Sequence, residues 1–242
     1  MKVAAWNIRH GGSRHQDLAT ALIAHDPDVI VLGEHQHQKT SALIDHLRFF
    51  GWLHVAVSAT PAAENGVAII SRVPLERRPS PFGESPFDRW GVEAVVGGIS
   101  IIGVYAPLPA SLGSPHVQRA FWKRVHRLVG GRHQDAVLII GDFNTCAPGV
   151  DGPNALACAE EFQHLSSLGW IDAWRARNPG ASDYSYVHNP LKNPSLWRID
   201  HAFVSPVLRG AVDECRYSHA ERDAGLSDHS MLLLNVPLIE AA

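Results

Sequence analysis

Short apolar runs that end in a polar or acidic residue recur along the chain and constrain its fold more than any other feature. They are rich in Val and Ile and cover residues 3–6, 29–33, 67–70, 99–104 and 137–141. Strands with one exposed face alternate apolar and polar residues, whereas these runs are almost entirely apolar, which is typical of strands buried on both faces. The pattern therefore predicts sheets that are covered on both sides, with helices outside them.

Amphipathic segments between the runs supply those helices. Apolar residues at helical spacing predict helices over 13–25, 38–50, 115–130 and, more weakly, 156–168. The Ser13 side chain is expected to cap the first of these. Further short strands are expected near the carboxyl end, at 184–187, 198–204 and 230–236. This order of elements favours mixed sheets with helices on their outer faces.

Composition supports a globular chain and excludes several classes of protein. The chain has 242 residues, of which 45% are hydrophobic and 19% charged, so disorder is excluded and one domain over residues 1–242 is expected. No apolar stretch approaches the roughly 18–20 residues of a membrane span. The first residues lack the apolar core of a secretory signal, so we expect a cytoplasmic protein that acts as a monomer.

Cysteine content and net charge narrow the function further. The cysteines, Cys146, Cys158 and Cys215, are three in number and far apart in the chain, which supports neither a disulfide framework nor a zinc knuckle. We expect Cys146 to be a small buried residue. A formal net charge of -3 argues against tight non-specific nucleic-acid binding through bulk charge, although a local basic strip remains compatible with it.

Carboxylates and their partners lie at several of the predicted strand ends, where open sheets gather their ligands. They are Glu34, Asp142 with Asn144, Asp200 with His201, and Asp228 with His229. Each one alone has a structural explanation, because Asp and Asn favour turns and caps. Their order along the chain and the residues around them distinguish the set from isolated turns.

In the order of these residues and in the short motifs around them, the chain resembles the endonuclease/exonuclease/phosphatase superfamily, which includes exonuclease III, the apurinic endonucleases and deoxyribonuclease I. The resemblance extends from residue 6 to residue 229. It rests on Trp6-Asn7-Ile8-Arg9, Leu32-Gly33-Glu34, Gly66-Val67-Ala68-Ile69-Ile70-Ser71, Val104-Tyr105-Ala106-Pro107, Gly141-Asp142-Phe143-Asn144, Arg198-Ile199-Asp200-His201 and Ser227-Asp228-His229. It implies a four-layer α/β/β/α sandwich in which two mixed β-sheets pack face to face.

The resemblance also implies a metal-dependent phosphoesterase, and specifically a nuclease that cleaves DNA phosphodiester bonds by in-line attack of an activated water. Glu34 matches the principal magnesium ligand, Asn7 helps set the metal and phosphate region, and Asp228 matches a residue near the metal. Mg²⁺ is the implied cofactor, with Mn²⁺ as a substitute. Physically, convergent acids need such a cation, because two like charges 4 Å apart repel by about 4 kcal/mol at an effective dielectric near 20.

The remaining implied roles concern the nucleophile and the phosphate. Asp142 matches the aspartate that orients or deprotonates the attacking water, and Asn144 supports the nucleophile and the phosphoryl oxygens. His229 matches the histidine that contacts the scissile phosphate, and Asp200 fixes its tautomer and favours its protonated form. Tyr105 matches a tyrosine that donates to the phosphate in the abasic-site enzymes.

The chain departs from the family pattern at two places that bear on the site. Gly33 replaces the usual glutamine before the metal glutamate, which removes a supporting group and leaves the pocket edge less defined. Arg9 matches the motif found in deoxyribonuclease I, whereas Tyr105 matches the motif found in the abasic-site enzymes. The motifs therefore point to two different subgroups of the family. Two aromatic-rich loops, 79–90 and 184–197, either bind ligand or pin long loops onto the body.

Three alternatives stay open from the sequence. The enzyme could act on a small phosphoester or a phospholipid head group, which the lack of a basic excess favours. The fold could be retained as a binding module, although the intact motifs argue against it. His35 and His37 have a spacing that could bind zinc, but no third ligand is evident. His201 is expected to be structural, because in a strand it points away from the face of Asp200.

Overall fold

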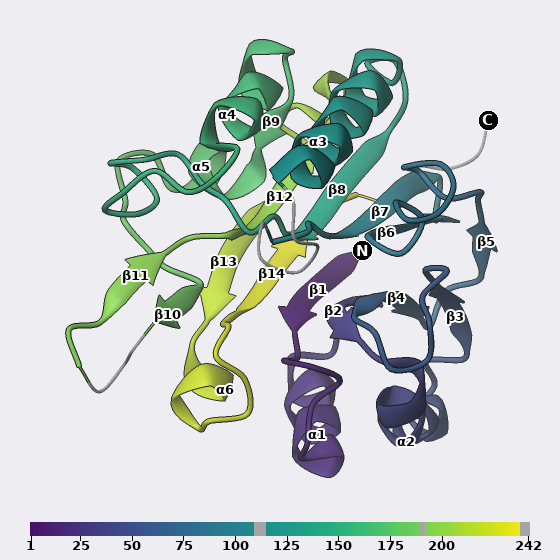
Figure 1. The fold of residues 1–242 in the computed structure, drawn as a ribbon. Helices are drawn as coiled ribbons and strands as arrows, with labels where there is room; N and C mark the ends of the chain where they lie inside the picture. Colours follow the sequence, from purple (N-terminus) through teal and green to yellow (C-terminus); the bar gives the residue numbers. More distant parts are fainter. Residues whose placement is uncertain (109–114, 189–191, 238–242) are drawn as a thin grey trace.

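Two mixed sheets form the centre of the computed structural model, which describes residues 1–108, 115–188 and 192–237 (Figure 1). Within this part the first sheet contains, in spatial order, β13 (Glu214–Ser218), β14 (Met231–Asn235), β1 (Lys2–Asn7), β2 (Val29–His35), β4 (Gly66–Ser71) and β3 (His54–Val57). The second contains β5 (Leu75–Arg77), β6 (Gly91–Val96), β7 (Ile99–Tyr105), β8 (Val137–Asp142), β12 (Asp200–Val204) and β9 (Ile171–Asp172). A hairpin of β10 (Tyr186–His188) and β11 (Ser195–Trp197) projects from the body.

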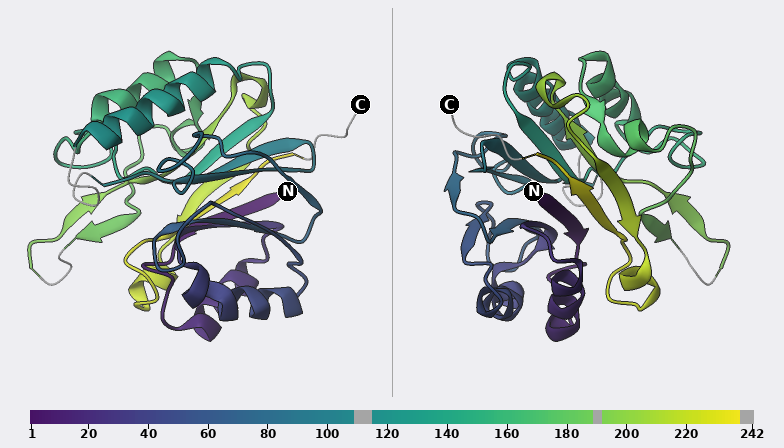
Figure 2. Two further views of the ribbon diagram at one scale, coloured as in Figure 1. Left: turned by 45° about the vertical axis from the view of Figure 1, so that its right-hand side comes forward. Right: turned by 180° about the vertical axis from the view of Figure 1, so that it is seen from behind.

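Helices cover the outer face of each sheet, as the two views of Figure 2 show. On the first sheet these are α1 (His15–His25) and α2 (His37–Phe49). On the second they are α3 (Pro115–Gly130), α4 (Ala159–Ser167) and the short α5 (Ala173–Arg177). Two short helices, the 3₁₀ helix η2 (Pro206–Leu208) and α6 (Ala220–Asp223), lie in connections. The four-layer α/β/β/α sandwich expected from the sequence is confirmed.

Alternation along β1 explains why its run is apolar throughout. Val3 and Ala5 belong to the core between the sheets, whereas Ala4 and Trp6 pack into the second core beneath α1 and α2. Successive side chains of a strand point to opposite faces, so a strand in the middle of four layers buries both sets. The sheets approach closely at Gly103, where an added Cβ would lie 2.8 Å from Val67 Cγ1.

Two local predictions have different outcomes. Helix α1 forms as expected, but Ser13 does not cap it: the N-cap residue is Arg14, and its side chain makes no capping hydrogen bond. In the 79–90 loop, Phe82 and Trp90 are each 2% exposed and belong to the core. These aromatics therefore pin the loop onto the body. In the described part of the chain, no helix is both long and apolar enough to cross a bilayer.

Strand direction brings the polar strand ends to one edge of the sandwich. β1 and β2 run parallel in the first sheet, and β7 and β8 run parallel in the second. β12 and β14 run antiparallel to β8 and β1, so they begin at the edge where those strands end. An isolated bridge between Tyr186 and His229 places the hairpin at the same edge.

Candidate active site

Asn7 joins the two sheets at this edge. It is the last residue of β1 and is 2% exposed. Its Nδ2 donates to Glu34 Oε1 at 3.1 Å and to Asp142 Oδ2 at 2.9 Å. Because Glu34 belongs to the first sheet and Asp142 ends a strand of the second, one amide group spans the space between the sheets. The structure therefore brings together acids that are more than a hundred positions apart in sequence.

The Glu34 carboxylate is positioned by an irregularity in β2. The register with β4 shifts between Gly33 and His35, and Glu34 has a φ of +55°. Such a bulge re-aims a side chain. Its Oε2 then accepts a hydrogen bond from the backbone N of His10 at 2.7 Å. A Cβ at Gly33 would meet Asn7 at ordinary contact distance, 3.5 Å, so the glycine is not required by packing.

Left-handed backbone is concentrated around the site. Of the seven non-glycine residues with positive φ in the described part of the chain, four lie here: Arg9 (+55°), His10 (+51°), Glu34 (+55°) and Asn144 (+50°). Each such conformation costs on the order of 1–3 kcal/mol and persists only where the surrounding structure imposes it. The concentration at one edge marks a functional site rather than a set of ordinary turns.

Asp142, Asp200 and His229 form a buried cluster next to Asn7. The register of the second sheet pairs Asp200 with Asp142, and His229 lies two residues before β14. Asp200 Oδ2 lies 2.8 Å from His229 Nδ1. One ligand atom from each of the three residues lies within 4.8 Å of the others, and none of the residues is more than 5% exposed.

Charge is distributed unevenly within this cluster. Burial alone lowers the pKa of His229, but the charge of Asp200 and its hydrogen bond outweigh burial and raise that pKa to about 10. Burial raises the pKa of Asp142 to about 7; the charge of Asp200 adds to this, and His229 opposes it. The site therefore combines a protonated imidazole with a carboxylate that exchanges its proton near neutral pH.

The chain leaves β8 along a path that only glycine accommodates. Gly141 has a φ of +141°, and a Cβ there would lie 2.1 Å from Val104 O. Beyond it, the backbone N of Asn144 donates to Asp142 Oδ1 at 2.8 Å. The Asn144 side chain donates from Nδ2 to Ala106 O at 2.7 Å. The turn thus orients the Asp142 carboxylate and fixes the Asn144 amide beside it.

Tyr105 and two residues missed by the sequence analysis complete the wall near Glu34. Burial, with the charge of Glu34 adding to it, raises the pKa of Tyr105, so the phenol keeps its proton. Asn65 Nδ2 lies 3.5 Å from Tyr105 Oη, and Asn65 Oδ1 accepts from Gln36 Nε2 at 2.8 Å. Asn65 precedes β4, which runs antiparallel to β2. Asn65 is a polar residue directly before an antiparallel strand. Attention to such positions in the sequence could have identified it.

A pocket of about 320 Å³ opens beside these groups. It is lined by Glu34, Leu108, Asn144, Leu156, Tyr186, His188, Trp197, Ile199, Asp228 and His229. The Tyr186 ring lies 4.9 Å from the His229 ring, between centroids. Asp228 Oδ2 lies 3.7 Å from Arg9 Nε, so a cationic side chain faces the acid. One wall of the pocket is therefore aromatic and apolar, and the other carries the polar groups.

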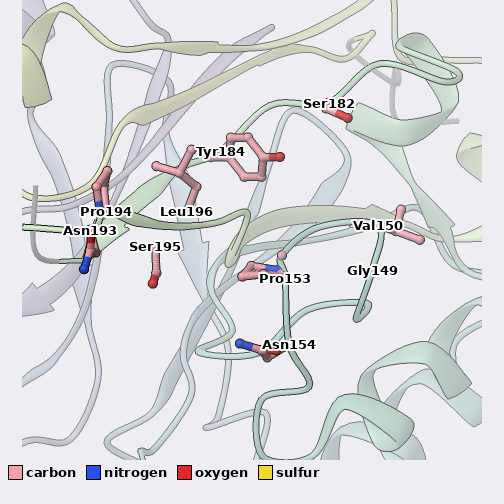
Figure 3. Close-up of a pocket in the computed structure, with 11 residues that line it drawn as sticks. Gly149, Val150, Pro153, Asn154, Ser182, Tyr184, Asn193, Pro194, Ser195 and Leu196 are labelled. Carbon is pink, nitrogen blue, oxygen red and sulfur yellow. The ribbon is translucent and has the colours of Figure 1, made fainter.

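A larger groove of about 720 Å³ is lined in part by Ser195 and Leu196 of the hairpin strand β11 (Figure 3). Its lining residues are Gly149, Val150, Gly152, Pro153, Asn154, Ser182, Tyr184, Asn193, Pro194, Ser195 and Leu196. None of these described residues carries a charge at neutral pH. Size alone therefore does not identify a site, and the smaller pocket is the one of the two lined by carboxylate and imidazole groups, Glu34, Asp228 and His229 among them.

Other candidates from the sequence do not join the site. His35 is 2% exposed, with Nδ1 2.6 Å from Thr40 Oγ1, whereas His37 is exposed. No ligand group of three described residues includes either ring, so the spacing does not form a zinc site. His201 and Cys146 are fully buried, and His201 Nε2 lies 3.2 Å from Thr145 O. Both are structural, as expected.

The donor set at the strand ends fits a hard divalent cation. Glu34 and Asp228 present carboxylates to the same pocket, and Asn7 holds the Glu34 side chain. Oxygen ligands of this kind, supplemented by water and substrate phosphate, are those that Mg²⁺ prefers. His229 is less suited to such an ion in its present form, because an imidazole whose Nδ1 faces Asp200 and whose pKa is raised retains its protons.

Comparison with solved structures places this arrangement among known folds. An AP endonuclease from Archaeoglobus fulgidus superposes with a TM-score of 0.85 at 20% identity, covering 98% of this chain and 99% of that one. A 3' phosphatase from Neisseria, bound to a product DNA hairpin, gives 0.83 at 24% identity with the same coverage. A 3'-5' exonuclease from Neisseria meningitidis gives 0.79 at 23% identity, also with 98% and 99% covered. These similarities establish the fold.

Sequence comparison identifies the family. No curated protein matches the chain significantly. The model of the Endonuclease/Exonuclease/phosphatase family matches residues 4–229, nearly the span over which the sequence motifs were recognised. Whether one domain extends over all of residues 1–242 stays a prediction. With the fold, the converging strand ends and the family match in agreement, the chain belongs to the Endonuclease/Exonuclease/phosphatase family.

Proposed function

We propose that the protein is a Mg²⁺-dependent nuclease that hydrolyses DNA phosphodiester bonds by in-line attack of water. The observation that carries the proposal is the Asn7 amide, which binds Glu34 and Asp142 at once. Because one amide contacts both groups, the candidate metal ligand Glu34 and the candidate base Asp142 lie no farther apart than a single side chain can bridge. A phosphoryl group bound between them would be exposed to both.

Glu34, Asn7 and Asp228 are the residues that would hold the cation. When bound, Mg²⁺ supplies Lewis-acid polarisation of a phosphoryl oxygen and offsets its charge. Mn²⁺ is expected to substitute for it. The chain's own contribution is to aim the Glu34 carboxylate, through the hydrogen bonds from Asn7 Nδ2 and His10 N. Since the His10 N–H is held by left-handed backbone and the Asn7 amide is fixed at the end of β1, the carboxylate is positioned before any ligand arrives.

Proton transfer falls to Asp142 and phosphate contact to His229. With its pKa raised to about 7, Asp142 can accept a proton from water near neutral pH. His229, cationic and hydrogen-bonded to Asp200, supplies positive charge where the phosphate becomes more negative. Asn144 and Tyr105 add N–H and O–H donors for the phosphoryl oxygens.

DNA is the proposed substrate class for two reasons. The superposed Archaeoglobus fulgidus protein is an AP endonuclease, and the Neisseria phosphatase was solved with a DNA product. The aromatic and apolar wall formed by Tyr186, Trp197 and Ile199 lies directly beside His229 and suits the flat faces of a sugar or base. A role in DNA repair follows from a substrate with an abasic or nicked strand.

Hydrolysis of plain, nicked and abasic duplex DNA tests the proposal. We expect cleavage with Mg²⁺ or Mn²⁺ and none with chelator, and we expect Glu34→Gln to require a higher metal concentration. The cleavage products distinguish endonuclease from exonuclease action. Equal loss of substrate with metal and with chelator contradicts the metal requirement, and no cleavage of any DNA by pure protein contradicts the substrate class.

The alternative is a phosphatase or phosphodiesterase for a small molecule or a phospholipid head group. The modest pocket volume of about 320 Å³ and the formal net charge of -3 favour it. A panel of bis-p-nitrophenyl phosphate, sphingomyelin and inositol phosphates separates the two, because only polyanion binding weakens steeply with salt. Inactivity on the whole panel would favour the binding-module hypothesis.

The cytoplasmic location and the monomeric state both stay predictions. Light scattering after size exclusion tests whether the protein is a monomer.

A further inference from the structure

His10 lies against the candidate metal carboxylate. Its Nδ1 is 3.2 Å from Glu34 Oε2, the oxygen that also accepts from the His10 backbone N at 2.7 Å. The imidazole is 67% exposed, whereas the Glu34 side chain is 13% exposed. Lys39 Nζ donates to His10 O at 3.2 Å and helps hold the turn. The ring therefore lies at the mouth of the site, reachable from solvent.

Asn65 indicates how the ring is oriented. Gln36 Nε2 donates to Asn65 Oδ1 at 2.8 Å, which turns the NH₂ group of Asn65 toward His10. That Nδ2 lies 3.1 Å from His10 Nδ1, closer than Asn65 Oδ1, which lies 3.5 Å from the same nitrogen. An amide NH₂ only donates, so the contact favours an Nδ1 that carries a lone pair rather than a proton. An Nδ1 that carries a lone pair 3.2 Å from a carboxylate oxygen is repelled by it unless a metal ion lies between them, whereas an Nδ1 that carries a proton would donate it to that oxygen.

The separation of the two atoms matches shared coordination of one ion. Ligand bonds of about 2.0–2.2 Å at right angles place neighbouring donor atoms roughly 3 Å apart. His10 Nδ1 and Glu34 Oε2 are already at this spacing, 3.2 Å. An imidazole nitrogen is a better ligand for Mn²⁺, Co²⁺ or Zn²⁺ than for Mg²⁺, which prefers oxygen.

From these contacts we infer that His10 is a direct ligand of the cation held by Glu34, and that it shifts the site's selectivity from Mg²⁺ toward Mn²⁺ and other transition metals. This inference rests on the proposed metal site and deepens it. Neither the motifs in the sequence nor the cluster of Asp142, Asp200 and His229 includes this residue. The protein would then bind Mn²⁺ more tightly than an all-oxygen site does.

Mn²⁺ itself is the probe. In the purified full-length protein loaded with one equivalent of Mn²⁺, electron spin-echo envelope modulation reports whether an imidazole ¹⁴N is bound directly to the ion. We expect that modulation in the unaltered protein and its loss in His10→Gln. By competition of Mg²⁺ against the Mn²⁺ signal, His10→Gln should weaken Mn²⁺ binding at least tenfold and Mg²⁺ binding less than threefold, because only the nitrogen ligand is lost.

His37→Gln is the matched control. His37 is exposed and close to Glu34 in sequence, and it should leave both the modulation and the affinities unchanged. Modulation that is absent from the unaltered protein, or that persists in His10→Gln, overturns the inference; the second result would assign the nitrogen to another histidine. Glu34→Gln separates this failure from that of the proposed function. If Glu34→Gln leaves Mn²⁺ binding intact, the proposed metal site itself is wrong.

Discussion

Two pairs of aspartates, one at the strand ends and one formed by Asp151 and Asp172, face opposite electrostatic surroundings; Asp172 is partly buried and the other three are buried. Asp142 and Asp200, at the strand ends, share a single cationic neighbour, His229, in their buried cluster. Asp151 and Asp172, in contrast, bind guanidinium groups. Arg198 Nε lies 2.8 Å from Asp151 Oδ1, and Arg198 Nη2 lies 2.6 Å from Asp172 Oδ2.

The pKa values diverge accordingly. Burial alone raises the pKa of Asp172, yet the hydrogen bond from His201 and the charges of Arg198 and His201 outweigh burial, and the pKa there is lowered. At Asp151, His201 and Arg198 likewise lower the pKa. At Asp142 burial prevails and the pKa rises to about 7. Burial by itself therefore does not define a catalytic carboxylate; the balance between burial and compensating positive charge does.

The largest expected effect concerns Asp151 and Asp172, whose negative charges are compensated by Arg198. Arg198→Met leaves two buried carboxylates without their main partner, so we expect a loss of about 3–5 kcal/mol in the free energy of unfolding. Urea denaturation with and without the substitution measures it. A loss under about 1 kcal/mol would show that this cluster is not a structural ion-pair network, and the contrast with the strand-end acids would fail.

Substitutions in the strand-end cluster of Asp142, Asp200 and His229 should lower activity more than stability. Asp142→Asn and His229→Ala are each expected to lower kcat at least roughly a hundredfold, since a positioned base or charge donor is lost. Asp142→Asn should destabilise the fold far less than Arg198→Met, because it removes one of two buried like charges and its amide oxygen keeps one of the two hydrogen bonds that the Asp142 oxygens accept. Parallel kcat and thermal-melting measurements check both statements. Near-normal kcat in either variant would remove its proposed role.

Metal-free stability should fall as the pH rises through the alkaline range. The pKa of His229 is raised from 6.5 to about 10 on folding, so its stabilisation is complete below about pH 6.5 and is lost on approach to pH 10. The slope is at most about 1.4 kcal/mol per pH unit. Denaturation in chelator from pH 7.5 to 9.5 measures it, above the range where Asp142 titrates. His229→Gln should flatten the slope; an equal slope in that variant assigns it to another group.

The smallest expected effect concerns an exposed ion pair, which serves as a reference for the buried ion pairs of Arg198. Arg216 Nε lies 2.6 Å from Glu214 Oε1, but both side chains are about half exposed. Arg216→Met should change the free energy of unfolding by less than about 1 kcal/mol, because water and side-chain entropy offset an exposed pair. Urea denaturation under the conditions used for Arg198→Met provides the comparison. A loss as large as that of Arg198→Met would mean that burial does not distinguish these pairs.

Much of the fold was predictable because it depends on local pattern. The apolar run at 3–6 and its counterparts became strands buried on both faces, and the amphipathic segments became α1 to α4. The predicted cap at Ser13 was wrong, since helix starts depend on tertiary contacts as well as on the local sequence. The motif residues were identifiable because they lie at strand ends, at the close of β1, β2 and β8 and at or just before the start of β12 and β14, where side chains reach the sheet edge.

The residues that the sequence did not reveal act through contacts across the chain. His10 and Asn65 belong to no recognised motif, and Gln36 lies two positions after Glu34 rather than before it. They meet because β4 is antiparallel to β2 and because the turn after β1 has left-handed backbone. Neither condition can be inferred from composition or spacing, since both follow from how separate strands are ordered in a sheet.

By itself the sequence determined the layered architecture, the family and the acids at the strand ends, because apolar periodicity and short motifs are local properties. Only the tertiary structure decided which acids are compensated. Strand register places Asp142 opposite Asp200, and the path of the loops brings Asp151 and Asp172 to Arg198, so residues far apart in the chain meet. Electrostatic energy depends on distances in space and on local dielectric, and neither is encoded at a single position.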